Sequence, residues 1–414
     1  MKIAVIGAGI SGLTAAYLLC GDNDITVFEA NDYAGGHTDT HDVEVEGKTY
    51  AVDTGFIVFN EMTYPNFVTL LKRLGVDYQR SSMTFSVKCE RTGLEYGPHN
   101  LDTFFAQRRN LLKPSLYRML LDILRFRSAF NGLLREGSNE QALGSYLQRH
   151  GYSRQFIDYF IFPLCSSLWS TDSGRIHDFP LRSLVKFLRN HGILEVRHPI
   201  EWKVIKGGSK RYVEKLTKPF ADRIRLNTPV RTVLRHEDHV EVHPADGIAE
   251  RFDHVVFGCH SDQALRMLKS ATPREREILG AIPYQQNQVV LHMDPSVLPE
   301  RRKLWSSWNY LIPREEVARV SLTYNMNILQ TLDCREVFCV TLNRPDAIMS
   351  EKAVGTYLYH HPQYTVEAPR AQRRHGEISG RNRTHYCGAY WGYGFHEDGV
   401  NSALAACRFF GKGL

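Results

Sequence analysis

The first twelve residues constrain the fold of this chain more than any other segment. An apolar run from Ile3 to Ile6 has the composition of a buried parallel strand, and three glycines follow it in the pattern G-x-G-x-x-G. Gly7 permits a tight turn, Gly9 lets a pyrophosphate approach the backbone, and Gly12 allows the next helix to pack against the strand. The pattern therefore predicts a βαβ unit that opens a dinucleotide-binding domain.

The start of the following helix and the end of the second strand complete this prediction. The first N–H groups of a helix lack partners within the helix, so they can face the phosphates. A second strand over residues 25–28 ends in Glu29, twenty-two residues after Gly7. A carboxylate at that place accepts hydrogen bonds from both ribose hydroxyls of an adenine dinucleotide. The nucleotide contacts predicted here come from Ile10, Ser11, Gly12, Glu29 and Ala30.

Four further segments indicate which dinucleotide is bound. Gly35-Gly36 closely follows the acid, and Asp53-Thr54-Gly55 follows a β-rich stretch. Lys206-Gly207-Gly208-Ser209 and the segment from Cys387 to Gly399 come later in the chain. Together with the N-terminal pattern, and in this order over the whole chain, they resemble the flavoprotein superfamily of flavin-containing amine oxidases, phytoene desaturases and protoporphyrinogen oxidases.

This resemblance implies FAD as the cofactor. In that superfamily the glycine pair wraps the phosphates and the flavin end of FAD, and the N-terminus of the last helix faces the flavin N1/C2=O edge. There the helix dipole stabilises the negative charge of the reduced ring. No Ser-Gly-Gly-Cys segment of the kind that tethers flavin is present, so noncovalent FAD is expected. The implied contacts are Gly35, Gly36, His37, Thr54, Gly55, Phe56, Val230, which clips the adenine, and Glu397, Asp398, Gly399 and Val400.

Two histidines are candidates for chemistry beside the flavin. The resemblance places His396 where amine oxidases have an aromatic wall of the substrate cage. Its imidazole either exchanges a proton beside flavin N5 or only supports the ring through a backbone hydrogen bond, and the supporting role is favoured. His191 is either a second polar group over the pocket or the C-cap of a helix followed by a turn at Gly192, and the cap is favoured.

Composition and pattern together predict the domain organisation. The chain has 414 residues, 43% hydrophobic and 23% charged, which is ordinary for a soluble enzyme of two domains. We expect an α/β fold in which a Rossmann-like FAD-binding domain is interleaved with a mixed α+β substrate domain. The FAD-binding domain is assigned to residues 1–95, 200–265 and 380–414, and the substrate domain to residues 96–199 and 266–379.

Several other features bear on location and on excluded functions. The eight cysteines form no C-x-x-C pair, and the first strand begins too early for a signal peptide, so a cytoplasmic protein with reduced thiols is expected. No P-loop, Gly-x-Ser-x-Gly elbow or nucleic-acid-binding module accompanies the net charge of +6. His236, His239 and His243 lack helical metal-ligand spacing, so no metal site is expected.

A predicted helical segment has a composition that bears on membrane contact. Apolar residues recur at helical spacing within the segment from Leu111 to Leu134, and a polar stripe separates them. The apolar positions are Leu116, Met119, Leu120, Ile123 and Leu124, and the polar ones are Arg118, Asp122 and Arg125. Further basic residues lie around them at Arg108, Arg109, Lys113, Arg127 and Arg135. This composition suits peripheral contact with the inner face of a membrane, but a core helix is the favoured interpretation. The uncharged run Tyr159–Trp169 fits either an apolar tunnel or the core.

Three motif segments resemble a bacterial subgroup of flavoproteins. They are Phe179-Pro180 with Phe187 to Gly192, Pro199 to Ser209, and Tyr390 to Gly399. Genes of that subgroup often lie beside those for cyclopropane-fatty-acid-synthase-like methyltransferases, which implies an acyl lipid as substrate. The expected activity is hydride removal from an apolar chain, that is, desaturation. A flavin amine oxidase, a flavin-dependent double-bond isomerase and a membrane-associated accessory flavoprotein without turnover remain alternatives.

Overall fold

The computed structural model describes residues 1–135, 141–193, 200–315 and 319–414. A parallel five-stranded sheet in the order β10-β2-β1-β14-β20 forms the nucleotide-binding part. Its strands are β1 (Lys2–Ile6), β2 (Asp24–Phe28), β10 (Ile224–Arg225), β14 (His254–Phe257) and β20 (Thr384–Tyr386). The β1 run from Ile3 to Ile6 is buried, as a strand covered on both faces must be. The expected α/β class and its Rossmann-like sheet are therefore confirmed.

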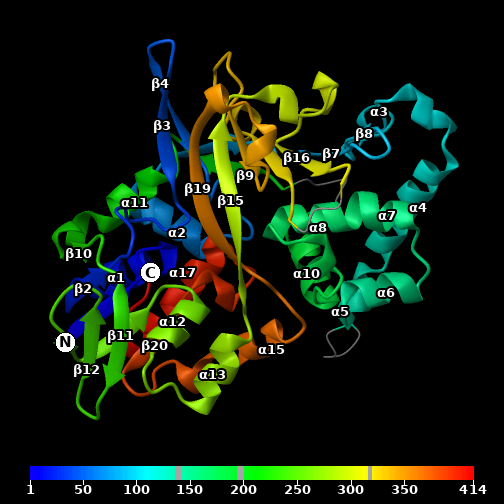
Figure 1. Cartoon of the computed structure of the whole chain (residues 1–414). Coiled ribbons are helices and arrows are strands. Elements are labelled where there is room, and N and C mark those ends of the chain that lie inside the picture. The colour runs from blue at the N-terminus through cyan, green and yellow to red at the C-terminus, as the bar shows by residue number, and fades with distance from the viewer. Residues whose placement is uncertain (136–140, 194–199, 316–318) are drawn as a thin grey trace.

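Helices cover one face of this sheet and a small antiparallel sheet lies against the other. The helices around the first face are α1 (Ile10–Leu19), α2 (Pro65–Leu74), α11 (Lys210–Thr217) and α17 (His396–Cys407). The three-stranded sheet consists of β11 (Val230–Arg235), β12 (Val240–Pro244) and β13 (Glu250–Phe252). Beside it lie α12 (Ser261–Met267), α13 (Pro273–Gly280), α15 (Ala368–Arg373) and α16 (His375–Ile378). In Figure 1 helix α17 lies beside α1, so segments from the beginning and the end of the chain pack together.

A seven-stranded sheet forms the second half of the molecule, in the order β19-β15-β18-β17-β16-β7-β8. Its strands are β7 (Phe85–Cys89), β8 (Leu94–Tyr96), β15 (Tyr284–His292), β16 (Trp308–Ile312), β17 (Leu322–Asn325), β18 (Cys339–Leu342) and β19 (Ala353–Pro362), with α14 (Met326–Leu329) after β17. The long strands β15 and β19 pair along their whole length and run from the upper sheet down toward α12 and α15 (Figure 1).

Two smaller strand groups join the halves. They are the hairpin of β3 (Thr40–Val45) and β4 (Lys48–Asp53), and the sheet of β5 (Val58–Asn60), β9 (Trp202–Ile205) and β6 (Tyr78–Ser81).

The predicted domain boundary at residue 95 falls within a strand of the larger sheet. Strand β7 pairs in parallel with β16, and β8 pairs with β7, so residues 85–96 belong to the larger sheet. A cut at residue 95 would divide β8 and separate β7 from β16, its partner in the larger sheet. The other boundaries remain a prediction, and the predicted substrate segments include residues 136–140, 194–199 and 316–318, which lie outside the described residues.

A group of helices projects from the larger sheet and forms the right-hand edge in Figure 1. The helices are α3 (Leu101–Phe104), α4 (Pro114–Ser128), α5 (Phe130–Arg135), α6 (Leu143–Arg149), α7 (Arg154–Phe156), α8 (Phe162–Trp169), α9 (Ser173–Ile176) and α10 (Leu181–Asn190). The uncharged run from Tyr159 to Trp169 lies mostly in the main hydrophobic core, so the structure favours core over tunnel. Among the described residues, no helix combines the length and apolar character needed to cross a membrane.

Helix α4 differs from its predicted pattern. Asp122, expected on the polar stripe, is buried, because its carboxylate accepts a hydrogen bond from the Ser153 N–H at 2.9 Å and is held by Arg118. Leu124, expected on the apolar face, is exposed to solvent. The spacing of the apolar residues correctly predicted a helix. Which of its faces is buried, however, depends on where the neighbouring helices pack.

Candidate flavin site

The glycine pattern forms a turn that leaves space beside the backbone. Gly7 has φ of +99°, and a Cβ on Gly12 would lie 1.9 Å from the carbonyl oxygen of Gly7, so both positions require glycine. At Gly9, by contrast, an added Cβ meets no atom within 4 Å. Gly9 is also the N-cap of α1 and has no side chain to cap the helix. The N–H groups of the first turn and the space beside Gly9 together suit a phosphate.

The predicted second glycine pair lies directly over this turn. The Gly35 N–H donates to the carbonyl of Ala8 at 2.8 Å, and a Cβ on Gly36 would lie 3.0 Å from the Cα of Gly9. Both glycines have positive φ, +141° and +61°. The structure thus brings together two segments that the sequence separates by about 25 residues, as the resemblance implies.

Glu29 lies buried at the end of β2 with its carboxylate toward the turn. One oxygen accepts from the Ala8 N–H at 2.7 Å and the other from the Asn31 N–H at 2.9 Å. Each carboxylate oxygen can accept more than one hydrogen bond, so both retain capacity for ribose hydroxyls. The predicted neighbour Ala30 is exposed. Thr228 donates its N–H to the Glu29 carbonyl at 2.7 Å. This bond places Val230, the predicted adenine contact two residues later, at the same end of the sheet as Glu29.

The N-terminus of α17 converges on that of α1. An added Cβ on Gly399 would lie 2.8 Å from Ile10 Cγ2 and 2.9 Å from Ser11 Oγ, so only glycine permits this approach. Val400 is fully buried in the same interface. Two helix N-termini, each with a positive dipole end, therefore face one region.

Glu397 and Asp398 have partners within the protein. The Glu397 carboxylate accepts the N–H groups of Asn66 at 3.2 Å and Phe67 at 2.9 Å and so caps helix α2. The Asp398 carboxylate accepts the Phe395 N–H at 3.0 Å, and burial raises its pKa to about 7. Both side chains hold helix ends in place, so a cofactor contact in this segment would come from backbone groups.

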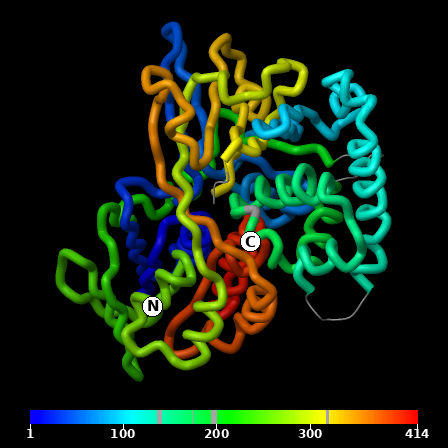
Figure 2. Tube along the Cα trace, turned by 45° about the vertical axis from the view of Figure 1, so that its right-hand side comes forward, coloured from blue at the N-terminus to red at the C-terminus, as the bar shows by residue number. Residues whose placement is uncertain are grey.

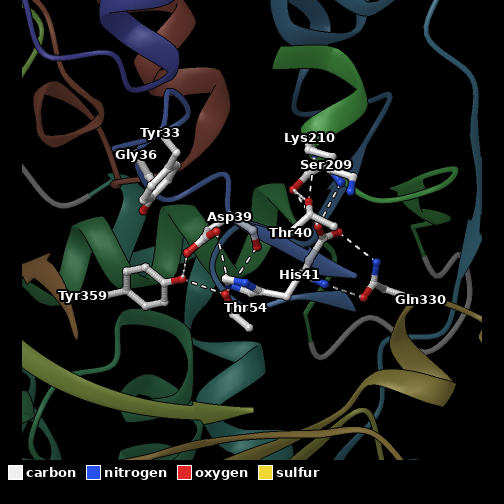
Figure 3. A network of polar contacts seen from close by, with 11 residues as sticks. Tyr33, Gly36, Asp39, Thr40, His41, Thr54, Ser209, Lys210, Gln330 and Tyr359 are labelled. Carbon is white, nitrogen blue, oxygen red and sulfur yellow. Dashed lines mark hydrogen bonds and ion pairs between the residues drawn. The ribbon is translucent and has the colours of Figure 1, made fainter. Parts of the chain in front are cut away.

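The segment Thr54-Gly55-Phe56 lies alongside His37. The Phe56 N–H donates to the His37 carbonyl at 2.6 Å, and a Cβ on Gly55 would lie 2.1 Å from that oxygen. Thr54 Oγ1 lies 2.6 Å from the hydroxyl of Tyr359, which donates to Asp39 at 2.7 Å (Figure 3). Strand β19 thereby reaches the flavin side of the nucleotide-binding sheet.

A second part of this hydrogen-bond network holds the glycine-rich segment Lys206–Ser209 in place. Asp53, fully buried at the end of β4, accepts the Ser209 N–H at 2.9 Å, the Ser209 hydroxyl at 2.8 Å and the Gln330 amide at 2.9 Å. Thr40 also donates to it, and Figure 3 shows Thr40, Ser209 and Gln330 converging. Burial raises the pKa of Asp53 to about 6, and its hydrogen bonds oppose that rise. Asp53 therefore anchors the segment before α11.

A histidine–tyrosine cluster adjoins the turn, and we define it as His37, His260, Tyr359 and His361. The His37 ring stacks on that of His361 with centroids 5.3 Å apart, and lies 6.2 Å from that of His260. Burial, and then repulsion from neighbouring histidines, lowers the pKa of His37 to about 4 and those of His260 and His361 to about 3. A nearby phosphate would favour their protonated forms.

Sequence reasoning missed His260, Tyr359 and His361. A signal for the last was present in the doublet His360-His361 before Pro362, because neighbouring residues of a strand point to opposite faces, so one of the two can face inward. The expected absence of metal sites stays untested. In the described part of the chain, His236, His239 and Glu241 offer ligand atoms within 4.8 Å of one another on the partly exposed β11–β12 hairpin.

His396, the candidate catalytic residue, is enclosed by protein groups. Its Nε2 lies 2.9 Å from the Tyr212 hydroxyl and 3.0 Å from Thr38 Oγ1. The ring stacks on Phe56, and Phe67 meets it edge-on. Burial lowers its pKa well below the usual value, so the imidazole is neutral. This geometry favours the supporting role over proton transfer.

We expect His396→Phe to keep turnover within severalfold of wild type. A phenyl ring restores the packing, and the hydroxyls of Thr38 and Tyr212 remain bonded to each other. His385→Phe, which replaces a buried histidine beside the C-terminal phenylalanines, is the control. The measurement is the pH–rate profile together with FAD content. A loss on the order of 10²–10⁴-fold with FAD content unchanged and one limb of the profile missing would instead establish proton transfer.

Aromatic side chains connect α17 to the helical group. Phe187 of α10 stacks on His191 at 3.9 Å and on Phe395 at 5.1 Å between ring centroids, and Tyr393 and Trp202 complete this aromatic cluster. His191 is the C-cap of α10, and Gly192 has φ of +58°, so the favoured cap is confirmed. Burial lowers the pKa of His191 to about 4. The motif segments of the predicted subgroup thus meet in one apolar region beside α17.

Comparison with known proteins matches the chain to a flavin-containing family and to solved structures of the same fold. The profile of the family described as flavin containing amine oxidoreductase matches residues 10–306. An L-amino-acid oxidase from Gloydius blomhoffii is 21% identical over 405 residues, which cover 86% of this chain and 75% of that protein. A cyclohexylamine oxidase from Brevibacterium oxydans superposes with a TM-score of 0.71 at 16% identity, covering 99% of this chain and 98% of that one. A CLA-producing fatty acid isomerase from P. acnes superposes with a TM-score of 0.69 at 18% identity and the same coverage.

Proposed function

The chain belongs to the family of flavin-containing amine oxidoreductases, and from this premise we propose that it uses noncovalent FAD to desaturate an acyl lipid. Bound FAD would supply a two-electron acceptor for a hydride from a substrate C–H bond. Loss of that hydride and of a proton from the adjacent carbon leaves a C=C bond. The protein would orient the chain, exclude water and stabilise negative charge at the flavin through the α17 N-terminus.

The residues present fit FAD. The uncapped start of α1 and the open space beside Gly9 would take the pyrophosphate, and Glu29 would take the ribose hydroxyls. Gly399 allows the second helix N-terminus to approach the same region. Cys387 is fully buried, and burial raises its pKa well above the usual value, which disfavours the thiolate needed to attach a flavin. These features support a noncovalent cofactor.

The aromatic cluster is the observation that carries the substrate class. It presents apolar rings and one neutral imidazole beside α17, and the adjacent carboxylates, Glu397 and Asp398, both accept backbone N–H groups. An ammonium substrate would gain little there, whereas an alkyl chain would bury its surface. The structural neighbour named as a fatty acid isomerase adds support, since it indicates that this fold accommodates acyl chains.

Anaerobic photometry of the purified holoprotein tests the proposal. We expect an unsaturated or methyl-branched acyl lipid to bleach the flavin lastingly, with a new double bond in the recovered lipid. Product without net bleaching would indicate the isomerase alternative. Bleaching by amines and not by acyl lipids would overturn the proposal and leave an amine oxidase, which the family and the similarity to an L-amino-acid oxidase make the second candidate.

A further inference from the structure

Helix α4 presents an apolar stripe to solvent. Tyr117, Leu121 and Leu124 are spaced i, i+4, i+7, so they lie on one face of the helix, and all three are exposed. Leu111 and Leu112 extend the stripe at the preceding 3-10 turn, and the Tyr117 hydroxyl joins the two by donating to the Leu111 carbonyl at 2.9 Å. We call these five residues the α4 patch. Leu112 is 87% exposed, Leu121 62% and Leu124 52%.

The opposite face of α4 already provides its attachment to the protein. Leu116, Met119 and Phe126 are buried in the main hydrophobic core. The helix therefore does not need the α4 patch in order to pack. Scattered exposed leucines are ordinary on protein surfaces, but a stripe continuing over several turns marks an interaction site.

The charge around the α4 patch is positive. Residues 101–128 contain six basic residues and two aspartates. Both aspartates are engaged by cations, Asp102 by Arg108 and Lys303, and Asp122 by Arg118 and Arg125. Arg109 and Lys113 also belong to this set of basic residues. An anionic surface would therefore be attracted, and a second copy presenting the same patch would be repelled.

The position of α4 also suits a flat partner. In Figure 1, α3 and α4 form the outer edge of the helical group, and in Figure 2 the same cyan segment again lies at the margin of the molecule. The helical group also contains α10, whose Phe187 meets the aromatic cluster beside α17. A surface bound at α4 would thus contact the same group of helices that contributes Phe187 to the proposed substrate region.

We propose that the α4 patch docks this protein on an anionic lipid bilayer, with Leu112, Leu121 and Leu124 entering the interface and the surrounding basic residues contacting the headgroups. The purpose of this docking rests on the proposed function, since an acyl substrate resides in a bilayer. The docking itself is a binding property and is measured without turnover.

Vesicle sedimentation tests the docking. The holoprotein is mixed with vesicles of phosphatidylcholine containing 30% phosphatidylglycerol, a composition chosen for the test, and with vesicles of phosphatidylcholine alone. We expect preferential binding to the anionic vesicles that weakens as salt is raised, because exposed charges are then screened. The triple variant Leu112→Ser/Leu121→Ser/Leu124→Ser should lose about tenfold or more of this partitioning, because less apolar surface is transferred into the interface.

Matched controls separate docking from general surface effects. Ile248→Ser changes a side chain that is 88% exposed in the loop between β12 and β13, and it should bind as wild type. Arg109→Gln/Lys113→Gln should weaken binding severalfold, whereas Arg231→Gln/Lys269→Gln on the nucleotide side should not. The charge pair also tests the docking if the triple variant does not fold, as judged by circular dichroism and flavin content.

Each outcome decides the matter. Wild-type protein that ignores anionic vesicles, or a folded triple variant that binds like wild type, would overturn the docking. Loss of a dimer in light scattering without any vesicle binding would assign the α4 patch to a second copy instead. If vesicles are bound but no acyl lipid reduces the flavin, the proposed function fails and the docking stands. If a detergent-solubilised lipid reduces the flavin but vesicles are not bound, the reverse holds.

Discussion

Gly12→Ala is expected to destabilise the protein by about 1–3 kcal/mol or more, as overpacking of a tight core does. Alanine would favour a helix interior by about 1 kcal/mol. However, its Cβ would lie 1.9 Å from the Gly7 carbonyl oxygen and 3.1 Å from the Gly7 carbonyl carbon. Backbone atoms cannot move aside as a flexible side chain can, so the clash outweighs the helix propensity.

Gly9→Ala is the matched control for Gly12→Ala. No atom lies within 4 Å of its added Cβ, and its φ of −78° is acceptable for alanine, so the apoprotein should unfold at the wild-type denaturant concentration. The methyl group would instead occupy the space assigned to the pyrophosphate, and FAD affinity should fall about tenfold or more. Denaturant unfolding of both apoproteins and FAD titration by fluorescence quenching give the two readouts. Normal FAD affinity in Gly9→Ala would show that the phosphates do not pass this residue.

Glu29→Ala is expected to weaken FAD binding about ten- to a hundredfold. Removing the carboxylate leaves buried ribose hydroxyls without a charged acceptor, a loss of roughly 1.5–3 kcal/mol. The Ala8 and Asn31 N–H groups also lose their acceptor, so some apoprotein stability is lost as well. The purified variant should be pale yet folded, as measured by the absorbance ratio at the flavin and protein bands and by circular dichroism.

Asp32→Ala is the control for Glu29→Ala, because it removes an exposed carboxylate three residues further along. It should keep its full flavin content. A fully yellow Glu29→Ala protein would mean that this carboxylate does not bind the ribose and serves only to hold the turn at Ala8.

The pairing of β15 with β19 explains how two parts of the chain complete one site. These strands pair from Tyr284–Pro362 at one end to His292–Ala353 at the other. The pairing delivers Tyr359 and His361 to the glycine turns at its lower end, while its upper end belongs to the larger sheet. The larger sheet and the nucleotide-binding turns are therefore joined by continuous strands, which suits the proposed reaction, in which a substrate C–H bond is held against the flavin.

The sequence by itself determined the nucleotide-binding half of this protein. The buried strand, the glycines, the helix and the acid at residue 29 lie close together in the chain, so their spacing alone specifies the βαβ unit. Strands β12, β14, β15 and β18 likewise carry alternating or clustered apolar residues, a local pattern that reports burial directly. The family resemblance followed from motif order, which also needs no tertiary information.

Only the tertiary structure decided how side chains far apart in the chain are used. It buried Asp122 and exposed Leu124 on one helix, and it made Glu397 the cap of α2 instead of leaving its carboxylate for a ligand. It also gave His396 two hydroxyl partners from Thr38 and Tyr212. Local pattern cannot specify these outcomes, because the burial of a polar group depends on which distant donor or acceptor arrives to satisfy it.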